Sequence, residues 1–113
     1  MSKKHKRPAR VLTIYVSGPM SGKLQHNFPA FNQATEHLRN LGHTVINPAE
    51  INTEPGTPWS DCMRNDIREM MVCDTVAVLP GWQESKGASL EVYIGKALGM
   101  NILPIEDFYL ETV

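Results

Sequence analysis

Glu91 is a carboxylate expected close to the carboxyl end of a strand in a parallel sheet, which is where such sheets bind their ligands. A helix is expected over residues 88–98, after an apolar run at 75–79 that reads as a buried strand, and Glu91 lies in the first turn or so of that helix. A carboxylate beside a helix N-terminus is stabilised as the anion. Gly87 and Gly95, four residues before and after Glu91, leave room for a close approach. These features make Glu91 a candidate nucleophile at the carboxyl end of a strand.

Asp66 is a second acid in an unusual setting, because it falls within or beside an apolar stripe of a helix expected over residues 57–72. The stripe runs at i, i+4, i+8 and i+11 and consists of Cys62, Asp66, Met70 and Cys73. A carboxyl placed there without a partner loses solvation, and its pKa should rise. A buried salt bridge to Arg64 or Arg68, or a position at the solvent edge of the stripe, would explain the pattern equally well.

Two acids in different environments are the usual equipment for cleaving a glycosidic bond. One carboxylate attacks or stabilises C1 of the sugar, and the other handles the proton of the leaving group. Tyr15 stands near the end of a first strand expected over residues 11–17. Its ring could simply pack in the core, or its phenol could hydrogen-bond to a catalytic carboxylate and orient it.

Several loop residues could bind a substrate. The loop at 18–23, GPMSGK, resembles a phosphate cradle in composition but lacks the G-x-x-x-x-G-K-S/T spacing of a P-loop, and ordinary turn chemistry also explains it. Ser85 and Lys86, before the Glu91 helix, could offer a hydroxyl and a positive charge to a phosphate. Trp82 could stack on a base or cover the edge of the core, whereas Trp59 is expected to pack.

Strands and helices alternate along the chain. Besides the elements above, a helix is expected over 29–41 and strands over 44–46 and 102–105. The residues expected to face inward are Phe31, Ala34, Leu38 and Leu41, then Met63, Ile67, Met70 and Met71, then Leu90, Ile94, Ala97 and Leu98. This order predicts an α/β fold: three α/β/α layers around a small parallel sheet, flavodoxin- or Rossmann-like. Ligands of such sheets bind beyond the carboxyl ends of the strands, so the loops after the first and third strands should converge.

Composition limits the function classes. Residues 1–10 hold five of the 11 basic residues and none of the 12 acidic ones. A basic, disordered tail is therefore expected before a single domain at 11–113. Because that domain is acidic, nucleic-acid binding is disfavoured. No apolar run approaches the roughly 18 residues of a membrane span, and no export signal is visible, so a cytoplasmic location is expected. The two cysteines suit neither a disulfide framework nor a zinc site. His26, His37 and His43 lack metal-ligand spacing and are expected at the surface or in turns.

The chain resembles the nucleoside 2-deoxyribosyltransferase-like superfamily, most of all a small uncharacterised branch, a domain of unknown function often found in phages and prophages. The matching pieces cover nearly everything after the tail. They are IYVSGPMSG at 14–22, NFPAFNQATEHLRNLGHTVINPAEIN at 27–52, CMRNDIREMMVCDTVAVLPGW at 62–82 and SKGASLEVYIGKALG at 85–99.

The resemblance implies a role for each acid. Glu91 matches the nucleophile that attacks C1′ of the deoxyribose and forms a glycosyl-enzyme. Tyr15 matches the tyrosine that orients this glutamate, and Asp66 matches the aspartate that helps to protonate the departing base. The transferases bind a free 5′-hydroxyl through an aspartate six residues before the nucleophile, and this chain has Ser85 there. The related deoxynucleoside monophosphate N-hydrolases also have serine there and hold a 5′-phosphate with it, which favours a nucleotide substrate.

The rest of the implied phosphate site lies in the first loop. The backbone of Gly18 and Met20 and the hydroxyl of Ser21 would complete it, although the hydrolases carry arginine at the position of Ser21, a loss that Lys23 or Lys86 could offset. Further candidates for substrate binding are Ser17, Trp82 and Gly87. Superfamily members are usually dimers or larger, and a neighbour's residues close the site. A homodimer or higher homo-oligomer, with no cofactor and no metal, is therefore expected.

The favoured function is hydrolysis of the base–(deoxy)ribose bond of a nucleoside 5′-monophosphate. A base-exchanging deoxyribosyltransferase differs only in whether water or a second base reaches the glycosyl-enzyme. A non-catalytic nucleotide-binding or sensing module is the alternative from another class. A nucleic-acid-binding accessory protein is disfavoured because only the tail is basic.

Overall fold

All four strands of the sheet run parallel, in the order β2-β1-β3-β4. The computed structural model describes residues 10–110. Its strands are β1 (Thr13–Ser17), β2 (Thr44–Ile46), β3 (Thr75–Val78) and β4 (Asn101–Pro104). β1 and β3 are the central pair, with Tyr15 opposite Val76 and Ser17 opposite Val78. The expected parallel sheet is confirmed, and its two central strands end side by side.

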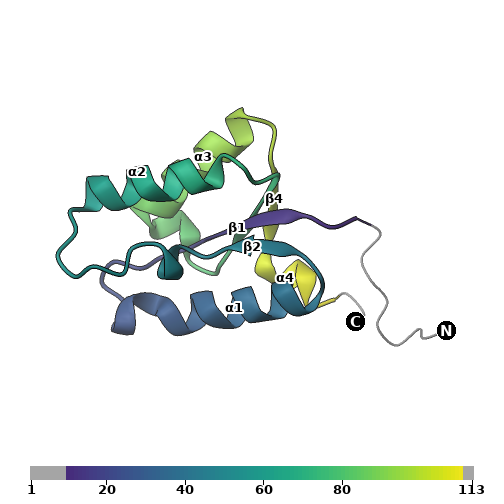
Figure 1. Cartoon of the computed structure of the whole chain (residues 1–113), viewed down its shortest axis with the longest axis horizontal. Coiled ribbons are helices and arrows are strands. Elements are labelled where there is room, and N and C mark those ends of the chain that lie inside the picture. The colour runs from purple at the N-terminus through teal and green to yellow at the C-terminus, as the bar shows by residue number, and fades with distance from the viewer. Residues whose placement is uncertain (1–9, 111–113) are drawn as a thin grey trace.

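Helices cover both faces of the sheet. They are α1 (Phe28–Asn40), α2 (Trp59–Met70), α3 (Lys86–Ala97) and the short α4 (Ile105–Phe108). α1 and α4 lie on one face, and α2 and α3 lie on the other (Figure 1). This is the expected α/β/α arrangement. α4 has no counterpart among the expected elements, because the stretch after residue 105 carried no usable pattern.

β1 divides its side chains between two cores. Ile14 and Val16 pack with α1 and α4, whereas Tyr15 packs with Met70 and Val92 on the opposite face. Successive side chains of a strand point to opposite faces, so residues two apart share a face. Ser17 therefore lies on the same side of the sheet as Tyr15, beneath α2 and α3.

The loops after β1 and β3 converge as expected. The backbone N–H of Leu79 donates to the carbonyl of Ser17 over 2.8 Å. A Cβ added to Gly18 would lie 2.7 Å from the Cβ of Leu79, and one added to Gly81 would lie 3.6 Å from Cγ of Pro19. Gly18 is thus required for this close approach, because any larger residue would drive the two strand ends apart.

α3 is rotated from the expected orientation: of the four residues expected inward, Ile94 packs partly buried against the core, and the other three do not. Leu90 and Leu98, expected in the core, are 39% and 61% exposed, and Ala97 is also exposed. The buried residues of the helix are Ala88, Glu91, Val92 and Gly95. A Cβ added to Gly95 would lie 3.2 Å from Cδ1 of Ile102, so this small residue lets the helix approach the sheet closely. The closest packing, not the largest apolar side chains, sets the rotation of α3.

Three smaller expectations were also wrong. Met71 is 45% exposed, because α2 ends at Met70. α2 begins at Trp59, two residues after the expected start: the Thr57 hydroxyl donates to the carbonyl of Glu54, and Pro58 is the N-cap residue. His43 is buried rather than at the surface, and its Nδ1 accepts the backbone N–H of Leu12 over 3.1 Å.

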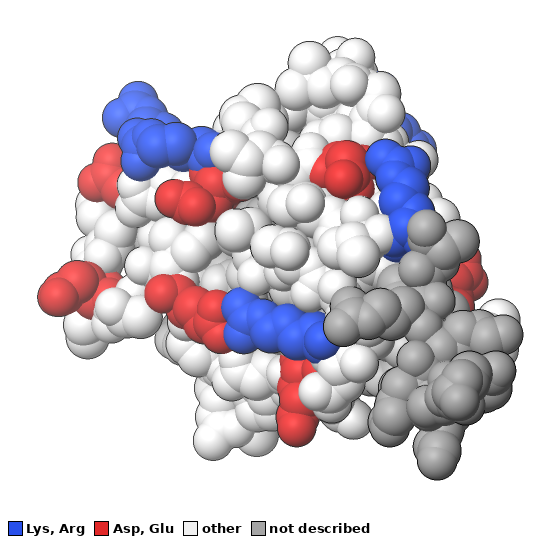
Figure 2. All heavy atoms as spheres, turned by 45° about the vertical axis from the view of Figure 1, so that its right-hand side comes forward, with Lys and Arg blue, Asp and Glu red and all other residues white. Residues whose placement is uncertain are grey.

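The surface agrees with the acidic character of the domain. On the face drawn in Figure 2, each group of basic side chains borders an acidic one, and they do not merge into a basic patch. No helix within residues 10–110 is long and apolar enough to cross a membrane. Residues 1–9 of the expected basic tail lie outside the described residues, and Arg10 is exposed.

Candidate active site

Two hydroxyl groups of β1 hold the carboxylate of Glu91. The Tyr15 hydroxyl donates to Oε2 over 2.8 Å, and the Ser17 hydroxyl donates to Oε1 over 2.6 Å. Glu91 is only 4% exposed, and both hydroxyl-bearing residues are fully buried. Because the donors stand two residues apart on one face of a central strand, the sheet fixes the orientation of both carboxylate oxygens.

Burial dominates the electrostatics of Glu91. Loss of solvation raises the pKa of Glu91 to about 7, the hydrogen bonds from Ser17 and Tyr15 act against this rise, and the nearby charge of Asp66 adds to it. Burial, followed by the charge of Glu91, also raises the pKa of Tyr15 well above its ordinary value of 10. Tyr15 therefore stays a neutral hydrogen-bond donor, and Glu91 is the group that changes charge near neutral pH.

Asp66 comes to the same place from α2. It is 7% exposed, and its Oδ1 accepts a hydrogen bond from Nδ2 of Asn52 over 2.6 Å. Burial raises the pKa of Asp66 to about 6, and the hydrogen bonds of Asn52 and Tyr15 act against this rise. Asp66 is paired with an amide, not with the arginines considered from the sequence: Arg64 lies 3.9 Å from Asp61, and Arg68 donates to Asn65.

Tyr15, Asp66 and Glu91 thus meet at one place, and they come from β1, α2 and α3. Tyr15 binds Glu91 directly and also lowers the pKa of Asp66, so it connects the two acids. The result is a pair of buried carboxyl groups with different partners. Such a pair can supply a nucleophile and a proton donor.

Ser85 stands at the start of α3. It is the N-cap residue of α3, and its Oγ accepts the backbone N–H of Ala88 over 3.1 Å. This bond uses a lone pair and leaves the hydroxyl proton available for an outside acceptor. Next to it, the ammonium of Lys86 lies 4.3 Å from the ring centroid of Trp59. Trp59, expected to pack, is 41% exposed and holds this cation.

The glycines around Glu91 make room for the protein itself. A Cβ added to Gly87 would lie 3.1 Å from Sδ of Met63 and 3.8 Å from Nε1 of Trp59, so Gly87 lets α2 and α3 pack closely. Gly95 does the same between α3 and the sheet. The close approach expected at these two positions is therefore made by neighbouring side chains.

The remaining candidates lie in the two converging loops. Met20 is half-buried and its carbonyl accepts the backbone N–H of Lys23, whereas Ser21 is exposed. Trp82 opens the 3-10 turn η3 (Trp82–Glu84) and packs, partly buried, against the cluster that contains Tyr15 and Val92. Within residues 10–110, no group of three His, Cys, Asp or Glu side chains is arranged to hold a metal ion.

Sequence reasoning missed two contacts of the site. Ser17 was proposed to bind substrate, but its hydroxyl is bonded to Glu91. The two-residue spacing from Tyr15 could have revealed this shared face. Asn52 was not considered at all, because an asparagine in a loop gives no sign of which helix it will contact.

Comparison with known proteins places the fold. No curated protein matches the chain. Among solved structures, a 2-deoxyribosyltransferase from the psychrotolerant bacterium Bacillus psychrosaccharolyticus superposes with a TM-score of 0.62 at 22% sequence identity. The match covers 80% of this chain and 69% of that one. This likeness confirms the predicted fold.

The family assignment rests on a longer match in sequence. The family described as "Domain of unknown function (DUF4406)" matches residues 12–104. This segment runs from the residue before β1 to the end of β4, so it includes the four strands of the sheet as well as Tyr15, Asp66 and Glu91. The chain therefore belongs to the DUF4406 family, whose member described here has the fold of the nucleoside 2-deoxyribosyltransferases.

Proposed function

We propose that this protein hydrolyses the N-glycosidic bond of a nucleoside 5′-monophosphate through a covalent glycosyl-enzyme. The observation that carries the proposal is the arrangement of Glu91. Its two oxygens are held by separate hydroxyls, and a second acid, Asp66, lies close enough to influence its pKa. A carboxylate that only stabilised the fold would have no need of burial beside another carboxylate, an arrangement that disfavours ionisation of both.

The first half of the reaction forms a bond to the sugar. An oxygen of ionised Glu91 attacks C1′, the C1′–N bond breaks, and protonated Asp66 gives its proton to the leaving nitrogen of the base. Tyr15 and Ser17 keep the attacking carboxylate in position. In the second half, water attacks C1′ while Asp66, now ionised, accepts a proton from the water. The ester to Glu91 breaks, and both acids return to their starting states.

The 5′-phosphate is assigned to the start of α3. An acid at position 85 would repel a phosphate, whereas the Ser85 hydroxyl retains a proton that it can donate. The positive end of the α3 dipole favours the same anion. The ammonium of Lys86 is held beside this helix start on the ring of Trp59, and its positive charge would offset the loss of the arginine that the hydrolases have at the position of Ser21.

The proposed protonation states predict a bell-shaped pH dependence. Base release requires Glu91 ionised, with a pKa of about 7, and Asp66 protonated, with a pKa of about 6. Because the group that must be ionised has the higher pKa, the reactive form is a minority at every pH; its population should rise up to about pH 6, reach a maximum near pH 6.5 and fall above about pH 7. Steady-state measurement of kcat/KM between pH 4.5 and 9 tests this. A plateau that persists above pH 8 would exclude Asp66 as the proton donor.

A homodimer or higher homo-oligomer is proposed to form on the outer face of α3. Leu90, Tyr93 and Ala97 stand at i, i+3 and i+7 on the outer face of α3, and Leu90 and Tyr93 are 39% and 71% exposed. This face lies opposite the residues that α3 buries, which include Glu91. A second copy packed on this face would contact α3, the helix that carries Glu91. The molar mass in solution, from light scattering across a range of protein concentrations, tests the proposal.

The function is tested by incubating the protein with a panel of ribo- and deoxynucleoside 5′-monophosphates and separating free base by chromatography. Base release from a monophosphate, and weaker release from the matching nucleoside, is the expected result. Addition of a second free base distinguishes the two enzymatic outcomes: formation of a new nucleotide would make the protein a transferase. Binding of a nucleotide without any release or exchange would instead identify a binding module.

A further inference from the structure

A chain of three hydrogen bonds leads from the surface of α2 to the buried acid Asp66. Arg68 Nη1 donates to Oδ1 of Asn65 over 3.2 Å, and Asn65 Nδ2 donates to Oδ1 of Asn52 over 3.2 Å. Asn52 Nδ2 then donates to Oδ1 of Asp66 over 2.6 Å. Arg68 is exposed, the two asparagines are half-buried, and Asp66 is buried. The shortest bond of the chain is therefore the one made to the acid.

These three hydrogen bonds can run in only one direction, from Arg68 toward Asp66. A guanidinium carries donors and no acceptor, so Arg68 obliges Asn65 to present its oxygen to the arginine and its NH₂ group to Asn52. Asn52 must then present its own oxygen to Asn65, which leaves its NH₂ group for Asp66. The orientation of an amide follows from its partners, and here a donor-only cation at one end sets the orientation of both amides.

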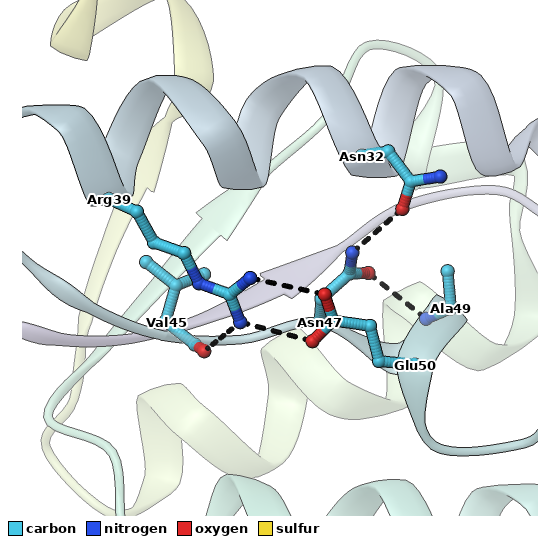
Figure 3. A network of polar contacts seen from close by, with 6 residues as sticks. All are labelled: Asn32, Arg39, Val45, Asn47, Ala49 and Glu50. Carbon is cyan, nitrogen blue, oxygen red and sulfur yellow. Dashed lines mark hydrogen bonds and ion pairs between the residues drawn. The ribbon is translucent and has the colours of Figure 1, made fainter.

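The backbone that carries Asn52 is fixed by separate contacts. Asn52 follows the 3-10 turn η2 (Pro48–Glu50), which comes directly after β2. Asn47 caps this turn by accepting the N–H of Ala49, and its NH₂ group donates to Asn32 of α1 over 3.0 Å (Figure 3). Arg39 of α1 also donates to both carboxylate oxygens of Glu50 over 3.0 and 3.1 Å. The turn is thus tied to α1, and the loop presents Asn52 to α2 from a fixed base.

Besides Asn52, Asp66 faces groups on three elements of the fold. Tyr15 of β1, Glu91 of α3 and Cys62 of α2 all interact electrostatically with it. The Tyr15 hydroxyl donates to Oε2 of Glu91, and its hydrogen bonding also lowers the pKa of Asp66. Burial raises the pKa of Asp66, and the Asn52 hydrogen bond opposes that rise more than Tyr15 does. Asn52 is therefore the group that most favours the ionised form of Asp66.

We propose that Asn52 is a positioning residue for the proton donor Asp66, aligned by Asn65 and Arg68, and that it directs the transferable proton to Oδ2. This inference rests on the proposed function. Because Oδ1 accepts from Asn52, the acidic proton of Asp66 resides on Oδ2. When the base departs, the Oδ2–H bond breaks and a new N–H bond forms on the base. The negative charge left on Asp66 is stabilised by the N–H group of Asn52 at Oδ1.

The first test is the Asn52→Ala variant, which removes the last hydrogen bond of the chain. Titration of the Asp66 carboxyl carbon by NMR, assigned with Asp66→Asn, requires no substrate. Its pKa is expected to move upward by about one pH unit, because a hydrogen bond to the ionised form is lost. With nucleotide, kcat should fall about tenfold, KM should change less than twofold, and the optimum of the pH profile should move upward by about half of the pKa change.

A second pair of variants tests the proposal even if Asn52→Ala does not fold. Arg68→Met leaves Asn52 in place but removes the cation that aligns the amides, and it should move the pKa of Asp66 in the same direction by a smaller amount. Arg64→Met removes an equal charge from the same helix at a side chain that is 77% exposed. Any change that it causes in the pKa of Asp66 measures the effect of charge alone and is subtracted from the change seen in Arg68→Met. Equal shifts in the two arginine variants would overturn the aligning role of Arg68.

The outcomes separate this inference from the proposed function. If the wild-type protein releases no base, the glycosidase fails, while the NMR titration still decides whether Asn52 controls the protonation of Asp66. If the wild-type protein is active and Asn52→Ala changes neither the titration nor kcat, the positioning role is excluded and the function stands. A loss of activity with an unchanged pKa of Asp66 would also overturn the positioning role.

Discussion

Base release from a nucleoside monophosphate is expected to fall by at least about 10³-fold in the Glu91→Gln variant, because this change removes the nucleophile. A neutral amide has nearly the same shape but does not attack C1′. The site accommodates glutamine without a void, since the hydroxyls of Tyr15 and Ser17 can each rotate to donate or accept. Chromatographic measurement of free base under saturating substrate checks this result.

The matched control is Glu84→Gln, which neutralises an exposed acid in the 3-10 turn that precedes α3. This variant should retain wild-type rates. Mass spectrometry of the wild-type protein quenched during turnover should detect a sugar-phosphate adduct on the peptide that contains Glu91. A Glu91→Gln variant that releases base at near wild-type rates would refute the covalent mechanism, whatever the identity of the substrate.

The second large effect is expected for Asp66→Asn, which removes the proton donor. The loss should be about 10²–10⁴-fold for a natural base, which leaves poorly as an anion. It should be much smaller for a nucleotide analogue whose leaving group departs without protonation, such as one with a nitrophenolate in place of the base. Comparing kcat for the two substrates isolates the proton-transfer role.

Asp61→Asn provides the control for this pair of substrates, since Asp61 is an exposed acid of the same helix, α2. It should affect neither substrate. If Asp66→Asn slows both substrates by the same factor, the aspartate acts through substrate binding or through the geometry of Glu91, and protonation of the leaving group would need another source.

Much of the fold could be predicted because the strands carry their own pattern. Residues 75–79 form an apolar run that ends at proline and glycine, and the structure has β3 over Thr75–Val78. The order of alternating strands and helices then left little choice of topology. Chain-local signals of this kind do not depend on which partner an element packs against.

The rotation of α3 could not be predicted in the same way. Leu90 and Leu98 have the larger apolar side chains, yet Gly95 and Ala88 face the sheet. Periodicity measures how apolar a helix face is, whereas the observed rotation depends on how closely the backbone can approach its neighbours. The burial of Glu91 beside β1 does not depend on that apolar pattern, because it follows from the position of α3 directly after β3.

The polar contacts likewise include some that the sequence could predict and some that it could not. The approach of Glu91 to β1 was predictable, because a parallel sheet brings strand ends and helix starts to one edge. Asp66 lies in the interior of α2, and its apolar stripe left its partner open. The contact of Asn52 with Asp66 depends on the path of a loop, and its amide is oriented by Arg68, 16 residues further along the chain. No local pattern in the sequence encodes that path.

The burial of Glu91 also has a consequence for the stability of the fold. Its pKa is about 7 in the folded protein instead of the ordinary 4.5, so the folded chain binds this proton more tightly than the unfolded chain does. The free energy of unfolding must therefore decline as the pH rises from about 4.5 through 7, by an amount on the order of 3 kcal/mol when the pKa difference is converted to energy. Above neutral pH the domain carries a buried negative charge that opposes its own folding. The small, tightly packed α/β/α body has to offset that charge with its two hydrophobic cores.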